Sequence, residues 1–182
     1  MPEYRRIKIE GATYFFTVNT NLRRPILTTE VVREALREGI NRVRQTMPFT
    51  IEAWVLLPDH IHTIWTLPPG DANYASRWAI IKREASKRWQ SSKGPTMLSA
   101  SQQIRQETGF WQRRFWEHQI RDDIDFQRHL DYIHWNPVKH GYARKVADWP
   151  YSTFHRFLAQ GLYPPDWGGF DPDGKSETDF GE

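Results

Sequence analysis

The first half of the chain places short apolar runs on either side of a longer segment with helical periodicity. Residues 13–20 (TYFFTVNT) combine aromatic and β-branched side chains in a short run, which predicts a buried strand. Thr28 or Thr29 can cap a helix that ends near Met47. Its apolar residues recur at helical spacing, at Val32, Leu36, Ile40 and Val43.

A hairpin pattern and a second amphipathic segment follow. Residues 50–57 and 60–67 each predict a strand, and the tight Pro58-Asp59 link between them predicts an antiparallel hairpin. A second helix begins at Asn73 or Ser76 and ends near Gln90. The apolar side of this helix carries Trp78, Ile81, Ala85 and Trp89. These residues are expected to fill the core, together with Trp54 and Trp65 of the hairpin.

The remaining pattern completes a known order of elements. Residues 91–108 are rich in Ser, Gln, Gly and Pro and predict a long loop, and residues 110–120 alternate from Arg113 onward, which predicts a fourth strand. Asp122 can cap a third helix over about residues 123–136. The order β-α-β-β-α-β predicts an α+β fold of the ferredoxin-like split βαβ type, with a four-stranded antiparallel sheet and helices on one face. The third helix and a tail are additions to that unit.

The third helix carries a tyrosine beside its core stripe. That stripe consists of residues three and four apart: Phe126, Leu130 and Ile133. At about 100° per residue, Tyr132 lies about 100° from the stripe, and Asn136 lies on the same flank as Tyr132. This periodicity predicts that Tyr132 faces a surface. Pro137 lacks an N–H, so the helix is expected to end or kink there and to leave the Asn136 amide oxygen free to reach outward.

Two histidines in the second hairpin strand offer metal ligands. His60 and His62 are two residues apart, so their imidazoles are expected on one face of the strand. Two convergent neutral imidazoles make half of a divalent-metal site. The segment from Asp131 to Pro137 supplies plausible partners. Since the chain has no cysteine, any metal must bind nitrogen and oxygen atoms.

Length and charge divide the 182 residues into one domain over 1–163 and an acidic tail over 164–182. The first part carries 24 basic and 16 acidic residues, and the tail carries one basic and six acidic residues. A basic body with an excess of aromatic residues indicates a polyanion-binding domain. The tail is either an appendage of opposite charge or a disordered, solubilising segment. No apolar stretch is long enough to span a membrane and the start lacks a secretion signal, so we expect a cytoplasmic protein.

These features together predict phosphodiester chemistry on nucleic acid. A phenol is a poor nucleophile at neutral pH unless a cation or a base assists it, and bound Mg²⁺ or Mn²⁺ can polarise a phosphodiester oxygen. Attack by Tyr132 on phosphorus would leave a covalent phosphotyrosine. Two rivals remain open, namely metal-dependent hydrolysis by water and a domesticated, non-catalytic protein that binds DNA hairpins. A two-histidine phosphoesterase is discounted because none of the seven histidines begins a His-x-Ser/Thr motif.

The chain resembles the REP-associated tyrosine transposases, a branch of the single-tyrosine HUH transposases. The resemblance is carried by Tyr4-Arg5-Arg6, residues 11–19 (GATYFFTVN), 57–62 (LPDHIH), 114–118 (RFWEH), 132–141 (YIHWNPVKHG) and 148–152 (DWPYS). It implies that Tyr132 is the nucleophile, that His60 and His62 bind the metal, and that Asn136 supplies a third ligand. It also implies a substrate of single-stranded DNA beside a REP-type hairpin, cleavage to a 5′-phosphotyrosine, and a monomeric enzyme.

Basic residues near the predicted site are the candidates for DNA contact. They come from the start of the chain, the second helix, the fourth strand and the motif after Tyr132: Arg5, Arg6, Arg77, Lys82, Arg83, Arg113, Arg114 and Lys139. Glu117 is expected either to assist the metal or to pair with an arginine. His134 points elsewhere on the third helix, where packing or DNA contact is expected rather than metal binding.

Overall fold

The computed structural model describes residues 8–93 and 109–168. At its centre lies a four-stranded antiparallel sheet with the strand order β2-β3-β1-β4. Its strands are β1 (Thr13–Asn19), β2 (Thr50–Leu56), β3 (His60–Thr66) and β4 (Trp116–Gln119). The first three agree with the prediction to within one residue at each end, and β2 and β3 form the expected hairpin. The fourth is shorter than the predicted 110–120, because Trp111 makes only an isolated bridge to Thr20 before regular pairing begins.

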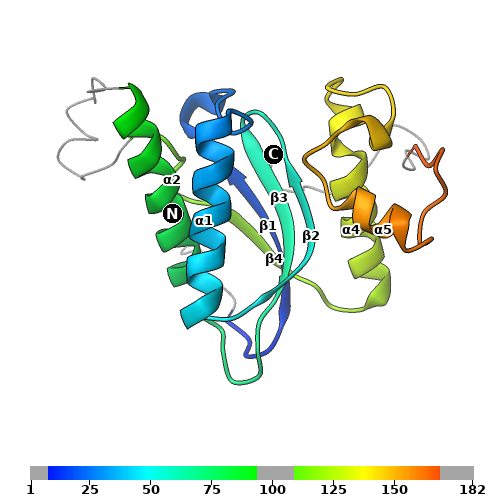
Figure 1. Ribbon diagram of the computed structural model, residues 1–182. Helices are drawn as coiled ribbons and strands as arrows, with labels where there is room; N and C mark the ends of the chain where they lie inside the picture. The colour runs from blue at the N-terminus through cyan, green and yellow to red at the C-terminus, as the bar shows by residue number, and fades with distance from the viewer. Residues whose placement is uncertain (1–7, 94–108, 169–182) are drawn as a thin grey trace, which may run out of the picture.

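Helices cover both faces of the sheet (Figure 1). Helices α1 (Glu30–Thr46) and α2 (Tyr74–Lys93) lie on one face, as the split βαβ pattern predicted. The additional helix α4 (Asp123–Lys139) lies on the opposite face with the short α5 (Phe154–Ala159). Two 3₁₀ turns, η1 (Asn21–Arg23) and η2 (Val146–Asp148), complete the elements of the described residues. The sheet is thus a central layer, and α4 alone among the long helices faces the side of β3 that carries His60 and His62.

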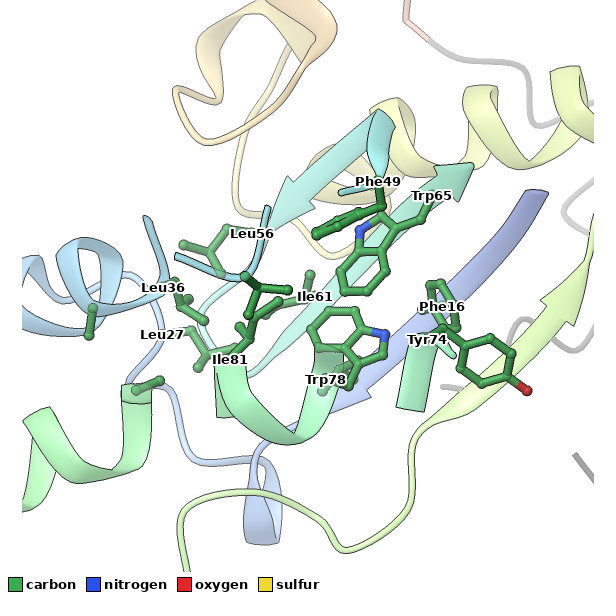
Figure 2. Close-up of a cluster of buried hydrophobic side chains, with 14 of the residues drawn as sticks. Phe16, Leu27, Leu36, Phe49, Leu56, Ile61, Trp65, Tyr74, Trp78 and Ile81 are labelled. Atoms are coloured by element: carbon green, nitrogen blue, oxygen red, sulfur yellow. The ribbon is translucent and has the colours of Figure 1, made fainter. Parts of the chain in front are cut away.

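Aromatic side chains fill the core between the sheet and the first two helices (Figure 2). Trp65 of β3 and Trp78 of α2 are fully buried and stack with ring centroids 4.3 Å apart and an interplanar angle of 15°. Phe16 of β1 and Phe49 pack against this pair. Burying a tryptophan removes roughly 200 Å² from water, worth on the order of 5 kcal/mol of transfer free energy. The predicted core role of Trp65 and Trp78 is confirmed.

The outer side of β2 is occupied by a later segment of the chain. Thr153 Oγ1 accepts a hydrogen bond from Trp54 N at 2.9 Å, and Thr153 N donates to Trp54 O at 2.9 Å. Leu56 N donates to Tyr151 O at 2.9 Å, and Trp149 Nε1 donates to Leu56 O at 3.0 Å. The backbone N–H and C=O groups of Trp54 and Leu56, which point away from β3, therefore have partners within residues 149–153.

Some sequence predictions fall outside the described residues. These are the basic pair Arg5 and Arg6, residues 94–108 of the predicted loop, and residues 169–182 of the predicted tail. Helix α2 runs to Lys93, so the segment predicted to be a loop from residue 91 begins as helix. None of the helices in the described part of the chain combines the length and apolar character needed to cross a membrane.

Candidate active site

The two histidines of β3 converge on the face of the sheet that α4 covers. Strand register pairs His60 with Asn19 and His62 with Thr17 of β1. Both side chains are fully buried, and their ring centroids lie 4.7 Å apart with the rings nearly perpendicular. The prediction that the imidazoles share one face is confirmed.

Neighbouring groups fix the Nδ1 atom of each ring. His60 Nδ1 donates to Asp59 Oδ1 at 2.7 Å, and His62 Nδ1 shares a hydrogen bond of 2.9 Å with Thr17 Oγ1. His60 Nε2 is buried and has no hydrogen-bond partner among the described residues. Burial also lowers the pKa of His60, which favours the neutral form that binds metals. Both rings therefore fit a divalent cation held through Nε2, with Asp59 and Thr17 as orienting partners.

Asp59 is itself anchored by a residue in a strained turn. Arg23 Nε donates to Asp59 Oδ2 at 2.7 Å, and Arg23 Nη1 donates to Asn19 Oδ1 at 2.8 Å. Arg23 and its neighbour Leu22 have φ angles of 52° and 57°, in the left-handed region that side chains other than glycine rarely adopt. The turn between β1 and α1 thus holds an arginine against the carboxylate behind His60. The sequence prediction gave neither Arg23 nor Asp59 a role in the site, although Asp59 directly precedes His60.

Helix α4 brings Tyr132 to the histidine pair. The Tyr132 ring lies 5.1 Å from the ring of His62 and 6.1 Å from that of Phe15, centroid to centroid. Its exposed fraction is only 9%, so the prediction of a surface-facing ring was wrong. The periodicity argument assumed one buried stripe, whereas α4 is buried on two flanks. The sheet covers the flank of Tyr132, and α5 covers the flank of His134.

The phenol oxygen of Tyr132 lies beside a lysine from the end of the same helix. Lys139 Nζ is 3.4 Å from Tyr132 Oη and 4.8 Å from the centre of its ring. Lys139 is an exposed residue, so the buried ring has its hydroxyl near a solvent-accessible charge. This contact places Lys139 at the tyrosine, and a role in DNA contact stays a prediction.

Asn136 lies one turn beyond Tyr132 and is fully buried. The helix does not end there, because α4 continues to Lys139 with Pro137 inside it. Pro137 removes a single backbone donor, and His140 N still donates to Asn136 O at 3.0 Å, so the last turn persists. His140, which sequence reasoning left unassigned, lies 5.2 Å from the ring of His60. Asn136 is therefore on the histidine-facing flank, but it is in the helix rather than at its terminus.

Two further residues considered for the site, Glu117 and His134, both lie away from the histidine pair. Glu117 lies on the opposite side of the sheet, where Tyr74 Oη donates to its Oε1 at 3.4 Å, so it does not assist the His60 and His62 pair. His134 packs against α5, with its ring 5.6 Å from Phe154, and its Nε2 is 3.1 Å from Thr153 Oγ1. Of the two roles expected for His134, packing or DNA contact, these contacts support packing.

Comparison with known proteins identifies the chain. Residues 8–136 match the family described as "Transposase IS200 like". A REP-associated tyrosine transposase of Escherichia coli strain K12 is 49% identical over 170 residues, which cover 93% of this chain and 92% of that protein. The chain belongs to the REP-associated tyrosine transposases.

Further relatives of this REP-associated tyrosine transposase extend the match over nearly its full length. A protein of Haemophilus influenzae is 45% identical over 180 residues, which cover 99% of this chain and all of that protein. A solved structure of a REP-associated tyrosine transposase bound to a REP hairpin has a TM-score of 0.77 and 47% identity, covering 95% of this chain and 94% of that one. The α+β fold is confirmed, and the family is one of DNA-processing enzymes.

The basic residues of this transposase divide into exposed and internal ones. Arg77 is fully buried, where it donates to both carboxylate oxygens of Asp71 and to the carbonyls of Met47, Asn73 and Pro48. The prediction that Arg77 contacts DNA was therefore wrong. Lys82 donates to Gln112 O at 2.8 Å, which holds the segment before β4.

Among the described residues predicted to contact DNA, the exposed ones are Arg83, Arg113, Arg114 and Lys139. Gln112 N donates to Asn19 O at 2.9 Å, so residues 112–114 lie at the end of the sheet where Asn19 pairs with His60. Arg113 and Arg114 thus stay candidates for DNA contact at the end of the sheet that carries the histidines.

Proposed function

We propose that this chain cuts and rejoins single-stranded DNA beside REP-type hairpins, using a divalent cation and a covalent 5′-phosphotyrosine. The observation that carries the proposal is the placement of Tyr132, whose ring lies 5.1 Å from that of His62. Strand β3 and helix α4, which are distant in the sequence, would thereby supply a pair of metal ligands and a nucleophile to one place. The solved relative bound to a REP hairpin supports the choice of substrate.

His60, His62 and Asn136 are the residues that would hold the cation. Two imidazoles and an amide suit Mn²⁺ at least as well as Mg²⁺, which usually prefers oxygen ligands. When bound, such a cation polarises a phosphodiester oxygen and neutralises the charge that develops during cleavage. Asp59 and Thr17 bond to the Nδ1 atoms of the two rings, so Nε2 of each ring would be the atom that binds the cation.

The proposed cleavage exchanges one phosphate ester for another. Tyr132 Oη forms a bond to phosphorus as the bond between phosphorus and the 3′ oxygen breaks. The phenolic proton leaves Oη and a proton is delivered to the 3′ oxygen, so the products are a 5′-phosphotyrosine and a free 3′-hydroxyl. Lys139 supplies positive charge 3.4 Å from Oη, where negative charge develops on the phenol. Because the new ester retains the energy of the old one, a 3′-hydroxyl can later attack it and rejoin the strand.

Replacement of Tyr132 by phenylalanine tests the proposal. Hairpin oligonucleotides with single-stranded flanks are incubated with the protein and Mn²⁺ or Mg²⁺, then analysed by denaturing electrophoresis. We expect the wild-type chain to retain a 3′-end label on the protein and to release a 5′-end label as a free fragment. Tyr132→Phe should lose the adduct entirely, since the phenol supplies the bond to phosphorus.

Tyr142→Phe is the matched control, because Tyr142 is exposed and contacts His140 near the histidine pair. This variant should form the adduct as the wild type does. An adduct that survives Tyr132→Phe would contradict the assignment of the nucleophile. Cleavage that survives without an adduct would indicate hydrolysis by water, and binding without cleavage in the wild type would indicate a non-catalytic hairpin-binding protein.

A further inference from the structure

A second group of metal-ligand side chains lies on the same face of the sheet as the His60 and His62 pair, with Phe15 between the two groups. His118 of β4 and Asp125 and His129 of α4 each offer a ligand atom, and these three atoms lie within 4.8 Å of one another. The sequence prediction assigned none of them to a metal. We propose that His118, Asp125 and His129 form a binding site for a borderline transition-metal cation such as Zn²⁺.

Sheet register and helix geometry bring the three residues together. His118 pairs with Phe15 of β1, so its side chain lies on the face covered by α4. Asp125 and His129 are one turn apart in α4 and therefore lie on the same side of the helix. A strand and the first two turns of a helix thus supply ligands at one point.

The distances within this group approach those of a coordinated cation. His118 Nε2 lies 2.8 Å from Asp125 Oδ2, and His129 Nδ1 lies 3.1 Å from Asp125 Oδ1. Ligand atoms at about 2.0–2.1 Å in a tetrahedral zinc site are roughly 3.3 Å from one another. Both rings already direct a nitrogen at the same carboxylate, so a cation would need only small shifts. Asp125 Oδ2 also accepts from Arg121 N at 3.0 Å, which holds the carboxylate in place. His129 Nδ1 lies 2.8 Å from Asp125 O, and a cation on that nitrogen would replace this hydrogen bond.

Charge and burial in this group suit a cation. The side chains of His118, Asp125 and His129 are only 20%, 19% and 5% exposed, so little water competes with a bound ion. Burial lowers the pKa of His129, which favours the neutral imidazole that binds metals. Burial opposes ionisation of Asp125, but the hydrogen bond from His118 and the backbone of Arg121 hold its pKa below the ordinary value. Two nitrogens and one carboxylate make a donor set typical of Zn²⁺ sites.

This second site is separate from the histidines of β3. The ring of Phe15 lies between them, 5.5 Å from the ring of His62 and 4.7 Å from that of His129. A cation here would tie β4 to the start of α4, and His129 precedes Tyr132 by three residues on that helix. Its consequence would be to fix the segment that carries Tyr132 against the sheet.

The test uses the full chain with the first site removed by His60→Gln and His62→Gln, after tag removal and chelator treatment. Calorimetric titration with Zn²⁺ should give one bound ion per chain, and Zn²⁺ should raise the melting temperature. Adding Asp125→Asn should weaken binding at least tenfold, because it removes the carboxylate and keeps both rings. Adding His155→Gln instead should change nothing, since that histidine is exposed and bonds only the Trp149 carbonyl among the contacts described.

Titration with Co²⁺ supplies a measurement that needs no change at the second site. The chain with His60→Gln and His62→Gln should show visible absorption that saturates at one Co²⁺ per chain. Absence of stoichiometric Zn²⁺ and Co²⁺ binding by this chain would overturn the inference. Binding that is unchanged by Asp125→Asn would overturn it as well. Either result leaves the proposed role of Tyr132 and the β3 histidines intact, because the chain tested lacks those histidines and neither titration measures DNA cleavage.

Discussion

At the scale of single residues, Asp59 connects the histidine pair to the rest of the fold. Its carboxylate accepts from His60 Nδ1 and from Arg23 Nε, each at 2.7 Å. Burial opposes ionisation of Asp59, but the hydrogen bond from His60 and the charge and hydrogen bond of Arg23 hold its pKa below the ordinary value. An ionised Asp59 keeps the proton of His60 on Nδ1, so Nε2 is the nitrogen available to a cation.

Replacing Asp59 by asparagine should therefore weaken cation binding at the β3 histidines. The amide is similar in shape but neutral, so it orients His60 less strongly. Loss of such an orienting partner typically costs 10- to 100-fold in metal affinity. We expect at least a tenfold loss of Mn²⁺ affinity by electron paramagnetic resonance titration, in a chain whose second cluster carries Asp125→Asn.

Asp148→Asn serves as the control for that measurement, because Asp148 is an exposed carboxylate outside the site. The Mn²⁺ affinity of this variant should match that of the chain that carries Asp125→Asn alone. Equal affinities for the Asp59 and Asp148 variants would show that Asp59 does not orient a ligand.

The sequence predicted some of these single residues and missed others for a physical reason. The two-residue period of a strand is a local property, so the shared face of His60 and His62 could be predicted. The burial of Tyr132 depends on the sheet packing against one flank of α4 while α5 covers another. Helical periodicity within α4 does not contain that information. Arg23 reaches Asp59 across 36 residues, which no local pattern encodes.

At the scale of elements, the contact between α1 and α2 depends on Gly39. A Cβ added at Gly39 would lie 3.5 Å from the Cα of Ile81 and 3.5 Å from the Cβ of Glu84, which is ordinary van der Waals contact. A single methyl group therefore fits, and anything larger must push the helices apart. The spacing of the two helices on this face of the sheet is set by that glycine.

Gly39→Ala should be neutral or stabilising by up to about 1 kcal/mol, because alanine is the better helix former. Gly39→Leu should destabilise by about 1–3 kcal/mol or more, because its side chain has no space between the helices. Urea denaturation measures both free energies of unfolding. Similar values for the two variants would mean that the helices move apart readily and that Gly39 sets no spacing.

The packing of α4 against α5 makes stability depend on pH. Burial, with the nearby charges of Arg156 and His155, lowers the pKa of His134 from 6.5 to about 3. Between these values the unfolded chain binds a proton that the folded chain excludes, so stability falls as the pH falls. The slope from one such group is roughly 1.4 kcal/mol per pH unit.

His134→Phe should flatten this dependence, since it removes the titrating group and keeps an aromatic ring against Phe154. Between pH 6 and 4 we expect the free energy of unfolding of the variant to fall less steeply than that of the wild type. The difference between the two slopes should be roughly 1.4 kcal/mol per pH unit, which corresponds to one proton. Urea denaturation at several pH values checks this. Parallel curves for the two chains would mean that His134 is protonated in the folded state.

Element boundaries were predictable where local signals were strong. The hairpin, α1 and the start of α4 follow from apolar periodicity and from Asp122, whose side chain accepts a hydrogen bond from Asp125 N. The fourth strand was predicted too long, because its alternation continues through residues that β1 does not pair regularly. Helix α4 passes Pro137, since a helix that is packed on two sides tolerates the loss of one backbone donor.

At the scale of the whole molecule, the basic residues are not equivalent. Arg77 is buried and connects α2 to the segment before β2 through a hydrogen bond to Pro48 O. Arg113 and Arg114 are exposed, at the end of the sheet where His60 lies. Composition alone counts all three as positive charge. Tertiary packing decides which of them can contact a phosphate. The sequence could therefore predict that the domain is basic, but not which of its basic residues lie on the surface.

Substituting both Arg113 and Arg114 by alanine should weaken binding of a REP-type hairpin and reduce its salt dependence. Each lost phosphate contact lowers the slope of log affinity against log salt by about one, so a decrease of about two is expected. Fluorescence anisotropy at several salt concentrations measures this slope. Arg44 is an exposed residue of α1, on the face of the sheet opposite to His60 and His62. Arg44→Ala should leave the salt slope unchanged. An unaltered slope in the double variant would place the DNA elsewhere.

The cover over β2 also has a consequence for assembly. Residues 149–153 bond to the Trp54–Leu56 end of the β2 border, and the opposite border is the four-residue β4, so the sheet offers little template for an incoming strand. Association of two copies would then have to use helices or loops of the described chain. Local detachment of residues 149–153 would expose the outward backbone groups of Trp54 and Leu56 in β2, and we expect fibrillar aggregation to start from that opened form.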